Sequence, residues 1–381
     1  MELNDQILKY LDERKDEHIA LLKELAAIPA PSHNEEKRVE FCKKWLEDAG
    51  CKGVYVDEAL NVIYPIDCEN KNEITAFFAH TDVVFPDVTP LPVVDDGTYI
   101  AAPGVGDDTA AVVAMMLVAK YIAQNGVTSK NGVVIVLNSC EEGLGNLKGT
   151  RQFFKDYEGR IKRFYSFDSA SFKGYANRCV GSHRYELTFK TEGGHSYGKF
   201  GNRNAIHAMA DLVCKLYECQ VPVIDGSKTT YNVGIVSGGT SVNTIAQETT
   251  LLYEYRSDNV ECLKIMQEFF EKTVEDARNR KTADIEVKTI GIRPCGEAED
   301  KEEFEAMCRH VERTCKKHSG VECQGKSSST DCNIPLSMGI PALTVPNYEG
   351  MGAHTREEKV LISSLPTGLR ITADMILGYC D

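Results

Sequence analysis

Several features are missing from this 381-residue sequence, and each absence excludes a class of protein. No stretch approaches the roughly eighteen consecutive apolar residues of a membrane-spanning helix. The amino-terminal segment MELNDQILKYLDERKDEH is charged and helical in pattern, and it lacks the basic start and apolar run of an export signal. Internal repeats and low-complexity tracts are also absent, which excludes a fibrous or disordered chain. We therefore expect a soluble, cytoplasmic protein.

Positive charge is in short supply. Lys and Arg number 43 against 57 Asp and Glu, which gives a net charge of -14. Such a surface repels phosphate backbones and anionic lipids, so we expect neither a nucleic acid partner nor a membrane partner.

Paired cysteines are a further absence. The chain has 14 cysteines, but none forms a CxxC pattern, which argues against a thiolate zinc site and a redox motif. We expect free thiols that pack as small apolar side chains. Cys140, directly before two acids, is the one cysteine whose position suggests metal or oxidation chemistry.

The apolar residues, 42% of the chain, alternate between strand-like and helix-like patterns. EITAFFAHTDVV and GVVIVLNSCEE are typical of buried strands on either side of a helical DDTAAVVAMMLVAKYIAQNG, and IKRFYSFDSA is typical of a further strand. Before them, Ser32 and Glu35 fit a capping box that opens a helix over EEKRVEFCKKWLEDAG. The alternation predicts an α/β fold with a mostly parallel sheet flanked by helices.

The pattern changes near residue 180. SHRYELTFKTEG, TTYNVGIVSGG and QETTLLYEYRSD alternate apolar and polar residues as half-exposed strands do, with one helix after the first and another after the third. A last strand at ADIEVKTI completes a small α+β unit of ferredoxin-like order. We therefore predict one domain over 1–178 and 294–381, with residues 179–293 inserted into it as a second domain.

Acids and histidines lie at or just beyond the ends of apolar runs, and His354 follows one after a glycine-bearing loop. They are His80 and Asp82 (AHTDVV), Asp107 and Asp108 (GVGDDT), Glu141 and Glu142 (CEEG), Asp168 (FDSA) and His354 (GMGAHTREE). In an open parallel sheet, sites form outside the carboxyl ends of the strands, so these segments can converge. Imidazole and carboxylate without thiolate suit zinc, manganese or cobalt in a catalytic site. Taken singly, each group is also typical of a solvated strand end.

A series of motifs carries a family resemblance. The motifs are HTD, GVGDD, CEEGLG, FDSA, GGHSYGKFGNRNAI, GGTSVNTI and STDCNIPLSMGIPALTVPNYEGMGAHT. Their order and approximate spacing resemble the dinuclear zinc peptidase family that includes peptidase T, glutamate carboxypeptidase, succinyl-diaminopimelate desuccinylase and aminoacylase. The likeness covers nearly the whole chain and is strongest to the peptidase T-like, tripeptidase branch. It implies a zinc exopeptidase-like catalytic domain with an inserted ferredoxin-like lid and dimerisation domain.

Carried over to this chain, the resemblance implies two divalent metal ions. Asp107 would bridge the ions, His80 and Asp168 would complete one of them, and Glu142 and His354 would complete the other. Zinc is the expected ion, with cobalt and manganese as alternatives.

The resemblance also implies how the site would work. Glu141 resembles the general base, which would take a proton from a bridging water and return it to the leaving amine after the hydroxide attacks the amide carbonyl. Adjacent residues on an extended backbone point in opposite directions, so Glu142 can bind metal while Glu141 faces the water. Asp82 would accept the free ring proton of His80.

Other residues complete the implied site. Asp331 and Asn333 are expected to organise the loop near His354. Thr109 stands where many relatives have a lysine, which leaves the local charge and the substrate preference open.

Three residues of the inserted domain are part of the resemblance. His195 resembles the histidine that reaches into the partner subunit's active site and stabilises developing negative charge, which implies a homodimer. Asn243 and Arg256 resemble positions that bind the substrate carbonyl and its terminal carboxylate. The alternatives are an exposed histidine in a glycine turn for His195, a turn amide for Asn243 and an ordinary strand-end charge for Arg256.

The expected function is metal-dependent hydrolysis of an amide bond in short peptides by an exopeptidase of tripeptidase or aminopeptidase type. A carboxypeptidase, or an N-acyl-amino-acid deacylase or amidase of the same family, is the alternative, because the residues do not decide which end of the substrate is held. A binding protein that kept the fold and lost the reaction is less favoured, since the ligands and the base are all present.

Overall fold

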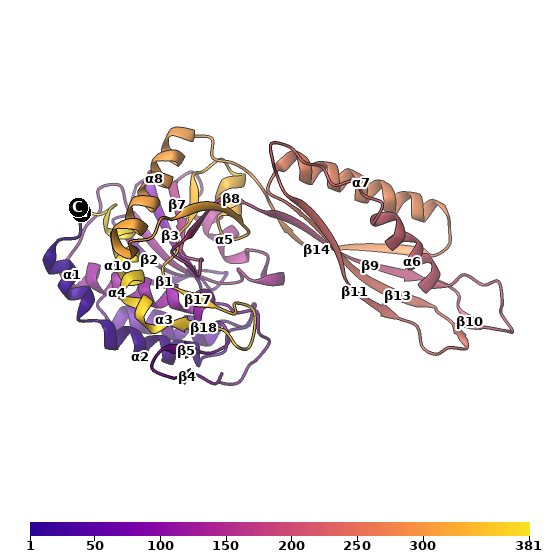
Figure 1. Ribbon diagram of the computed structural model, residues 1–381, viewed down its shortest axis with the longest axis horizontal. Coiled ribbons are helices and arrows are strands. Elements are labelled where there is room, and N and C mark those ends of the chain that lie inside the picture. The colour runs from indigo at the N-terminus through magenta and orange to yellow at the C-terminus, as the bar shows by residue number, and fades with distance from the viewer. The chain divides into compact units, whose positions relative to one another are not determined.

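The computed structural model describes residues 1–381 and divides into two compact units (Figure 1). The larger unit comprises Met1–Cys179 and Glu297–Asp381, and the smaller unit comprises Val180–Gly296. The small unit is therefore an insertion, and its bounds lie one residue and three residues from those that the sequence predicts.

An eight-stranded sheet forms the centre of the larger unit, in the order β1-β2-β6-β3-β7-β16-β8-β15. Neighbours from β6 to β16 pair in parallel, while β1, β2 and β6 pair antiparallel. Strands β3 and β6 are buried along their whole length, as in a sheet covered on both faces. The predicted, mostly parallel sheet is confirmed. The strands span Tyr55–Val56 (β1), Val62–Ile66 (β2), Ile74–His80 (β3), Val133–Asn138 (β6), Ile161–Ser166 (β7), Gly174–Cys179 (β8), Gln324–Ser328 (β15) and Ala342–Thr344 (β16).

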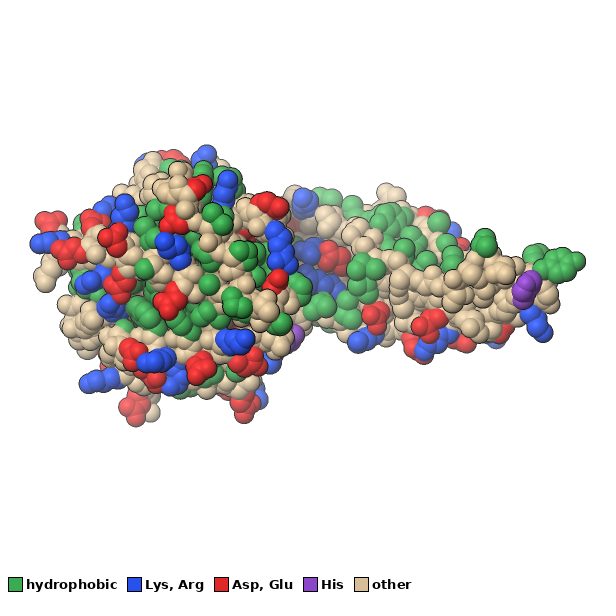
Figure 2. Space-filling view, turned by 90° about the horizontal axis from the view of Figure 1, so that it is seen from below, with side chains coloured by type: hydrophobic (Ala, Val, Ile, Leu, Met, Phe, Trp, Pro, Cys, Tyr) green, Lys and Arg blue, Asp and Glu red, His purple; other side chains and the backbone are tan.

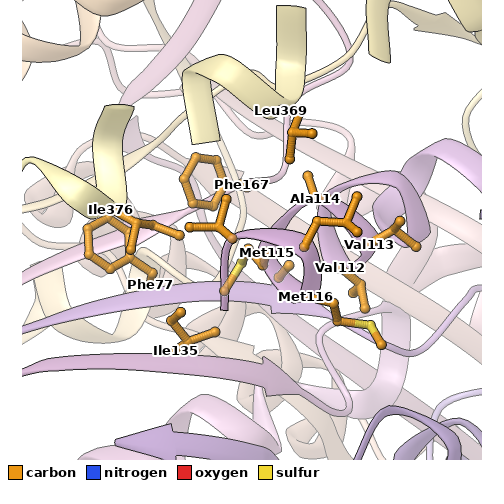
Figure 3. Close-up of a cluster of buried hydrophobic side chains, with 14 of the residues drawn as sticks. Phe77, Val112, Val113, Ala114, Met115, Met116, Ile135, Phe167, Leu369 and Ile376 are labelled. Carbon is orange, nitrogen blue, oxygen red and sulfur yellow. The ribbon is translucent and has the colours of Figure 1, made fainter. Parts of the chain in front are cut away.

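Helices flank this sheet. They are α1 (Asp5–Asp12), α2 (Lys15–Ala26), α3 (Glu36–Asp48), α4 (Ala111–Asn125), α5 (Lys148–Asp156), α8 (Lys301–Ser319), α9 (Asn333–Ser337) and α10 (Leu365–Leu377). Helix α4 is buried on nearly every side because its sequence is apolar all round. Its Met115 packs with Phe77 of β3, Ile135 of β6, and Leu369 and Ile376 of α10 in the core of the unit (Figure 3).

Shorter elements complete the larger unit. A second sheet has the order β17-β18-β5-β4. Its strands span Val94–Asp95 (β4), Tyr99–Ala101 (β5), Gly350–Met351 (β17) and Lys359–Leu361 (β18), and the single-turn helical segments are Val105–Ala110 (η1), Gly143–Gly145 (η2) and Ile362–Ser364 (η3).

The small unit has the predicted ferredoxin-like order of strand, helix, two strands, helix and strand. Its antiparallel sheet runs β11-β13-β9-β14, and α6 and α7 pack on the face that carries Tyr185 and Tyr253. Phe270 of α7 stacks on both tyrosines, with ring centroids 4.2 and 5.5 Å away. The elements span Gly181–Lys190 (β9), Gly194–His195 (β10), Ala205–Leu216 (α6), Thr229–Gly238 (β11), Thr244–Ile245 (β12), Glu248–Ser257 (β13), Val260–Asn279 (α7) and Asp284–Arg293 (β14).

The predicted capping box at the start of α3 is wrong. The helix begins at Glu36, and its cap residue Glu35 makes no side-chain capping bond. The hydroxyl of Ser32 donates to Asp82 at 2.6 Å, and Glu35 accepts the N–H of Cys140 at 3.0 Å. Both side chains are therefore used by loops that lie far away in the sequence.

Candidate metal centre

The carboxyl ends of three neighbouring parallel strands bring the predicted ligands together. His80 is the last residue of β3, Asp168 follows β7 by two residues, and the acid pair follows β6. Because β6, β3 and β7 are adjacent and parallel, these residues emerge at one edge of the sheet. The ligand atoms of His80, Asp107 and Asp168 all lie within 4.8 Å of one another.

A second group shares Asp107 with the first. It contains Asp107, Glu142 and His354, again with ligand atoms within 4.8 Å of one another. Oδ1 of Asp107 lies 3.0 Å from Nε2 of His80, and Oδ2 lies 3.0 Å from Nε2 of His354. Nε2 of His354 is also 3.0 Å from Oε1 of Glu142. The two oxygens of Asp107 thus face the two groups, as a bridging carboxylate would.

Glu141 lies beside the same groups. Its carboxylate and that of Glu142 have oxygen atoms within 4.8 Å of a ring nitrogen of His80, and both side chains are buried. The residue before them, Cys140, has a φ of 54°, a left-handed conformation that side chains rarely adopt. His354 has a φ of 64°. Such residues concentrate at functional sites, where the surrounding structure holds them.

The pKa values of the cluster are shifted because several buried acids lie close together. Burial and the charge of Asp107 raise the pKa of Asp168 well above its ordinary value, and the same causes raise the pKa of Glu142 to about 7. Burial also opposes ionisation of Asp107, but hydrogen bonds from His354 and His80 hold its pKa well below the ordinary value. Hydrogen bonds with Asp107 and Glu142 raise the pKa of His354 to about 11.

This donor set fits two divalent cations. Four carboxyl groups surround two imidazoles, and both donor types are ligands that zinc, manganese and cobalt accept. Positive ions between the carboxylates would offset their mutual repulsion. His80 and Asp168 would hold one ion, Glu142 and His354 the other, with Asp107 between them.

Asp82 contacts both the acid pair and His80. Its side chain binds the main chain of the acid pair, and its carbonyl oxygen faces the ring of His80. Nδ1 of His80 is 3.0 Å from the carbonyl oxygen of Asp82, whereas the Asp82 carboxylate lies 3.6 Å from the ring, beyond hydrogen-bond distance. The carboxylate instead accepts the N–H groups of Glu141 at 2.9 Å and Glu142 at 3.0 Å. The carbonyl of Asp82 is therefore the nearer acceptor for the ring proton of His80, and the role predicted for its carboxylate stays a prediction.

Arg38 of α3 is a buried residue that the sequence analysis missed. Its guanidinium donates to the carbonyl of Thr81 at 2.9 Å and to the hydroxyl of Thr109 at 3.0 Å. Burial lowers the pKa of Arg38 to about 10, so the group stays charged at neutral pH. A cation therefore lies against Thr109. No local signal marks Arg38, which lies in an amphipathic helix among other charged residues.

Asp108 is a second buried acid beside the site. Its Oδ2 accepts the N–H of His80 at 3.1 Å, while Oδ1 has no partner within the protein. Burial raises the pKa of this carboxyl well above its ordinary value. Asp108 thus supports the main chain at the end of β3.

Asp331 lies in the turn before α9 and contacts the end of β6 and the start of α5. Its carboxylate accepts from the amide of Asn138 at 2.8 Å and from the hydroxyl of Thr150, and not from the loop of His354. Asn333 accepts the N–H of Thr330 at 2.9 Å within its own turn. For Asp331 the predicted role is therefore corrected, because it supports the segment that carries the acid pair. For Asn333 the role stays a prediction.

Cys140 lacks the properties of a reactive thiol. Its side chain is buried, and burial with the charge of Glu35 raises its pKa to about 12. A thiol that stays protonated is a poor metal ligand and a poor nucleophile.

The structure places His195 and Asn243 in one ribbon of the small unit. His195 of β10 pairs with Thr244 of β12, and the carbonyl of Asn243 accepts the N–H of Ser196 at 2.9 Å. The ring of His195 is exposed, with the N–H groups of Tyr197 and Gly198 3.3 Å from Nδ1.

Arg256 of β13 is paired within its own strand. Its Nε and Nη2 donate to the two oxygens of Glu254 at 2.9 and 3.0 Å. A carboxylate ligand at Arg256 would therefore share the guanidinium with Glu254 or displace it.

Comparison with known proteins gives the class. Residues 76–378 match the model of peptidase family M20/M25/M40, and the chain belongs to this family. It is a hydrolase of the metallopeptidase class. None of its helices combines the length and apolarity that crossing a bilayer requires.

Known proteins match nearly the whole chain, one in sequence and two in structure. An uncharacterized protein of Bacillus subtilis (strain 168), YqjE, is 23% identical over 376 residues, which cover 94% of this chain and 96% of YqjE. A tripeptidase of Staphylococcus aureus has a TM-score of 0.75 at 19% identity, covering 95% of this chain and 97% of its own. The metallo-carboxypeptidase Sso-CP2 of Sulfolobus solfataricus has a TM-score of 0.74 at 14% identity, covering 95% and 99%.

Proposed function

We propose that this chain is a dinuclear metal-dependent exopeptidase that hydrolyses an amide bond of short peptides. The observation that carries the proposal is the two-sided contact of Asp107, whose oxygens each lie 3.0 Å from a different histidine. Zinc is the ion that we expect, with cobalt or manganese as alternatives. Bound there, two divalent ions would polarise the scissile carbonyl and lower the pKa of the attacking water.

Glu141 is the proposed general base. Its carboxylate lies against His80 and Glu142, and its main chain is fixed by the bond from its N–H to Asp82. In the proposed reaction Glu141 removes a proton from water and delivers it to the leaving amine, so the carboxylate is regenerated in each cycle. Glu142 would stay on the metal throughout.

The adjacent acids supply a matched pair of variants. Glu141→Gln is expected to retain the metal content of the wild type and to lose turnover by about 10²–10⁴-fold, because only the proton acceptor is removed. Glu142→Gln is expected to lose metal, because a ligand is removed. Elemental analysis with tripeptide hydrolysis measures both. Near-full activity of Glu141→Gln would refute the assignment of Glu141 as the general base.

Metal content of the wild type tests the class of function. About two ions per chain, with cleavage that chelation abolishes and zinc restores, is the expected result. If the protein binds no metal and stays inactive with zinc, manganese and cobalt, the binding-protein alternative replaces the peptidase.

We propose that the small unit forms a homodimer in which His195 serves the partner's site. Strand β11 is an edge of its sheet and exposes Ile235 and Val236 by 57% and 54%. Tyr197 and Phe200, near His195, are 90% and 92% exposed. Hydrophobic side chains are visible on the surface of this unit at the right of Figure 2. Such an edge and such apolar side chains favour association.

Complementation tests this arrangement. Mixing subunits of His195→Ala with subunits of Glu141→Gln gives hybrid dimers in which one site has an intact base and receives an intact histidine from its partner. Regain of activity on mixing supports donation across the interface. If the two inactive variants stay inactive after subunit exchange has been verified, donation of His195 across the interface is contradicted.

Which end of the substrate is held decides between peptidase types. We propose that Asn243 binds the substrate carbonyl and that Arg256 binds a terminal carboxylate, for which a guanidinium is suited. Tripeptides with a blocked amino end or a blocked carboxyl end test this. Cleavage that survives amino blocking excludes the aminopeptidase and favours the carboxypeptidase or deacylase alternative.

A further inference from the structure

Glu358 is a buried acid between the loops that carry Asp107 and His354. It lies four residues after His354, directly before β18, and is 2% exposed. Its Oε1 accepts the N–H of Gly106 at 2.8 Å and the N–H of Asp107 at 2.7 Å. Its Oε2 accepts the N–H of Gly104 at 2.9 Å. One carboxylate therefore binds three main-chain donors of a single turn.

The main chain on either side of Glu358 joins the same two segments. The carbonyl of Glu358 accepts the N–H of Ala102 at 3.2 Å, and the next residue, Lys359, pairs with Ala101 of β5. The turn from Gly104 to Asp107 thus begins where this pairing ends. Strand pairing sets the approach of the two segments, and the Glu358 side chain sets the position of the turn beyond it.

The turn fits closely around the carboxylate. A Cβ on Gly106 would lie 2.9 Å from Oε1 of Glu358 and 2.9 Å from the ring of Tyr348. Real Cβ atoms rarely approach other atoms so closely, so this position requires glycine as long as both neighbours stay in place. The main chain at Gly106, directly before Asp107, is therefore held between a charge-assisted acceptor and a packed aromatic ring.

We propose that Glu358 is a positioning residue of the metal centre. By binding the N–H of Asp107 from a segment continuous with His354, it fixes the separation of the shared carboxylate and the exposed histidine. This inference rests on the proposed dinuclear function. Groups that orient the ligands of a metal typically change metal affinity by about 10–100-fold when they are removed.

Three variants distinguish a positioning role of Glu358 from an effect of its charge and from an effect on the stability of the protein. Glu358→Gln keeps the length but turns an amide N–H₂ toward main-chain donors. Glu358→Asp keeps the charge but is one methylene too short to reach three donors. Glu357→Gln is the matched control, since Glu357 is the exposed neighbour in the same segment.

The measurement is metal affinity by chelator competition on the full chain, together with the visible spectrum of the cobalt-loaded protein and thermal unfolding of the metal-free protein. We expect about a 10–100-fold loss of affinity for both Glu358 variants and a changed cobalt spectrum, since the spectrum reports ligand geometry. Glu357→Gln should match the wild type. The metal-free Glu358 variants should unfold at lower temperatures than the wild type, because buried main-chain donors lose their acceptor. Affinities and spectra are therefore compared at a temperature at which every metal-free form is folded.

The outcomes are distinct. Wild-type affinity in Glu358→Gln overturns the inference, and wild-type affinity in Glu358→Asp alone replaces positioning with a simple effect of charge. If Glu358→Gln does not fold, Gly106→Ala provides the test of positioning. Its added methyl group would push the Glu358 carboxylate out of place without removing the carboxylate. Unchanged affinity there overturns the inference as well. A wild-type protein without metal would instead refute the proposed function.

Discussion

Replacing Asp82 by Asn should disturb the acid pair without removing a metal ligand or the base. The buried carboxylate accepts the N–H of Glu141 on Oδ1, and the N–H of Glu142 and the hydroxyl of Ser32 on Oδ2. An amide has one acceptor oxygen, so its best placement keeps the two bonds at Oδ2. Its N–H₂ group then faces the N–H of Glu141, which becomes a buried donor without an acceptor.

The magnitude follows from these contacts. A hydrogen bond to a charged group contributes about 1.5–3 kcal/mol, and an unsatisfied buried donor costs about 1–3 kcal/mol. Because both terms concern the same donor, we expect the free energy of unfolding to fall by about 2–4 kcal/mol. A displacement of the base on the order of 1 Å would lower kcat/KM by about 10²-fold.

Urea unfolding of the metal-free protein and tripeptide hydrolysis by the loaded protein measure the two effects. Ser32→Ala is the matched control, because it removes the third bond and leaves both main-chain bonds to Asp82. It should cost about 1.5–3 kcal/mol, because the lost bond also ends on the charged carboxylate, but it should change kcat/KM little. The reasoning is refuted if Asp82→Asn lies within about 0.5 kcal/mol of the wild type, or if Ser32→Ala impairs hydrolysis equally.

Three further predictions concern stability. Burial lowers the pKa of His18 to about 4, so the folded state resists a proton that the unfolded state binds near pH 6.5. The contribution of His18 to the free energy of unfolding is then fully present above pH 6.5, and about 3 kcal/mol of it is lost as the pH drops towards 4. His18→Leu should remove this pH dependence. Parallel pH profiles of the variant and the wild type would contradict the prediction. Although burial opposes it, hydrogen bonds from His318 and Lys317 lower the pKa of Asp374 to about 2. Asp374→Asn should therefore lower the free energy of unfolding by about 2 kcal/mol at pH 7, and this difference should shrink as the pH falls from about 4 towards 2. An unchanged unfolding midpoint at pH 7 would argue against the contact. Chelation should lower the thermal midpoint, because the two proposed cations would bind the folded state only; equal midpoints with and without zinc would exclude tight binding.

Much of the fold could be predicted because local pattern and burial agree. The unbroken apolar runs of β3 and β6 fit strands buried on both faces, and the apolar helix α4 fits a core element. In the small unit, the half-exposed alternation of β9 and β13 gave the ferredoxin-like order directly.

The remaining elements could not be predicted, because their structure depends on distant partners. Strand β15, an exposed QGKSS segment, has no apolar alternation and forms only by pairing with β8. The capping box at Ser32 and Glu35 has the right local spacing, but Asp82 and Cys140 bind these side chains. A motif within one segment does not reveal competition from another.

For the candidate site, the sequence by itself determined the donor types and their places beyond strand ends, because side-chain chemistry and strand periodicity are local properties. Only the tertiary structure decided that Asp107 faces both histidines and that Asp82 holds the acid pair. It also decided that Arg38 lies against Thr109 and that Glu358 binds the turn of Asp107. Each of these contacts joins groups far apart along the chain, and strand order, register and packing set their distances.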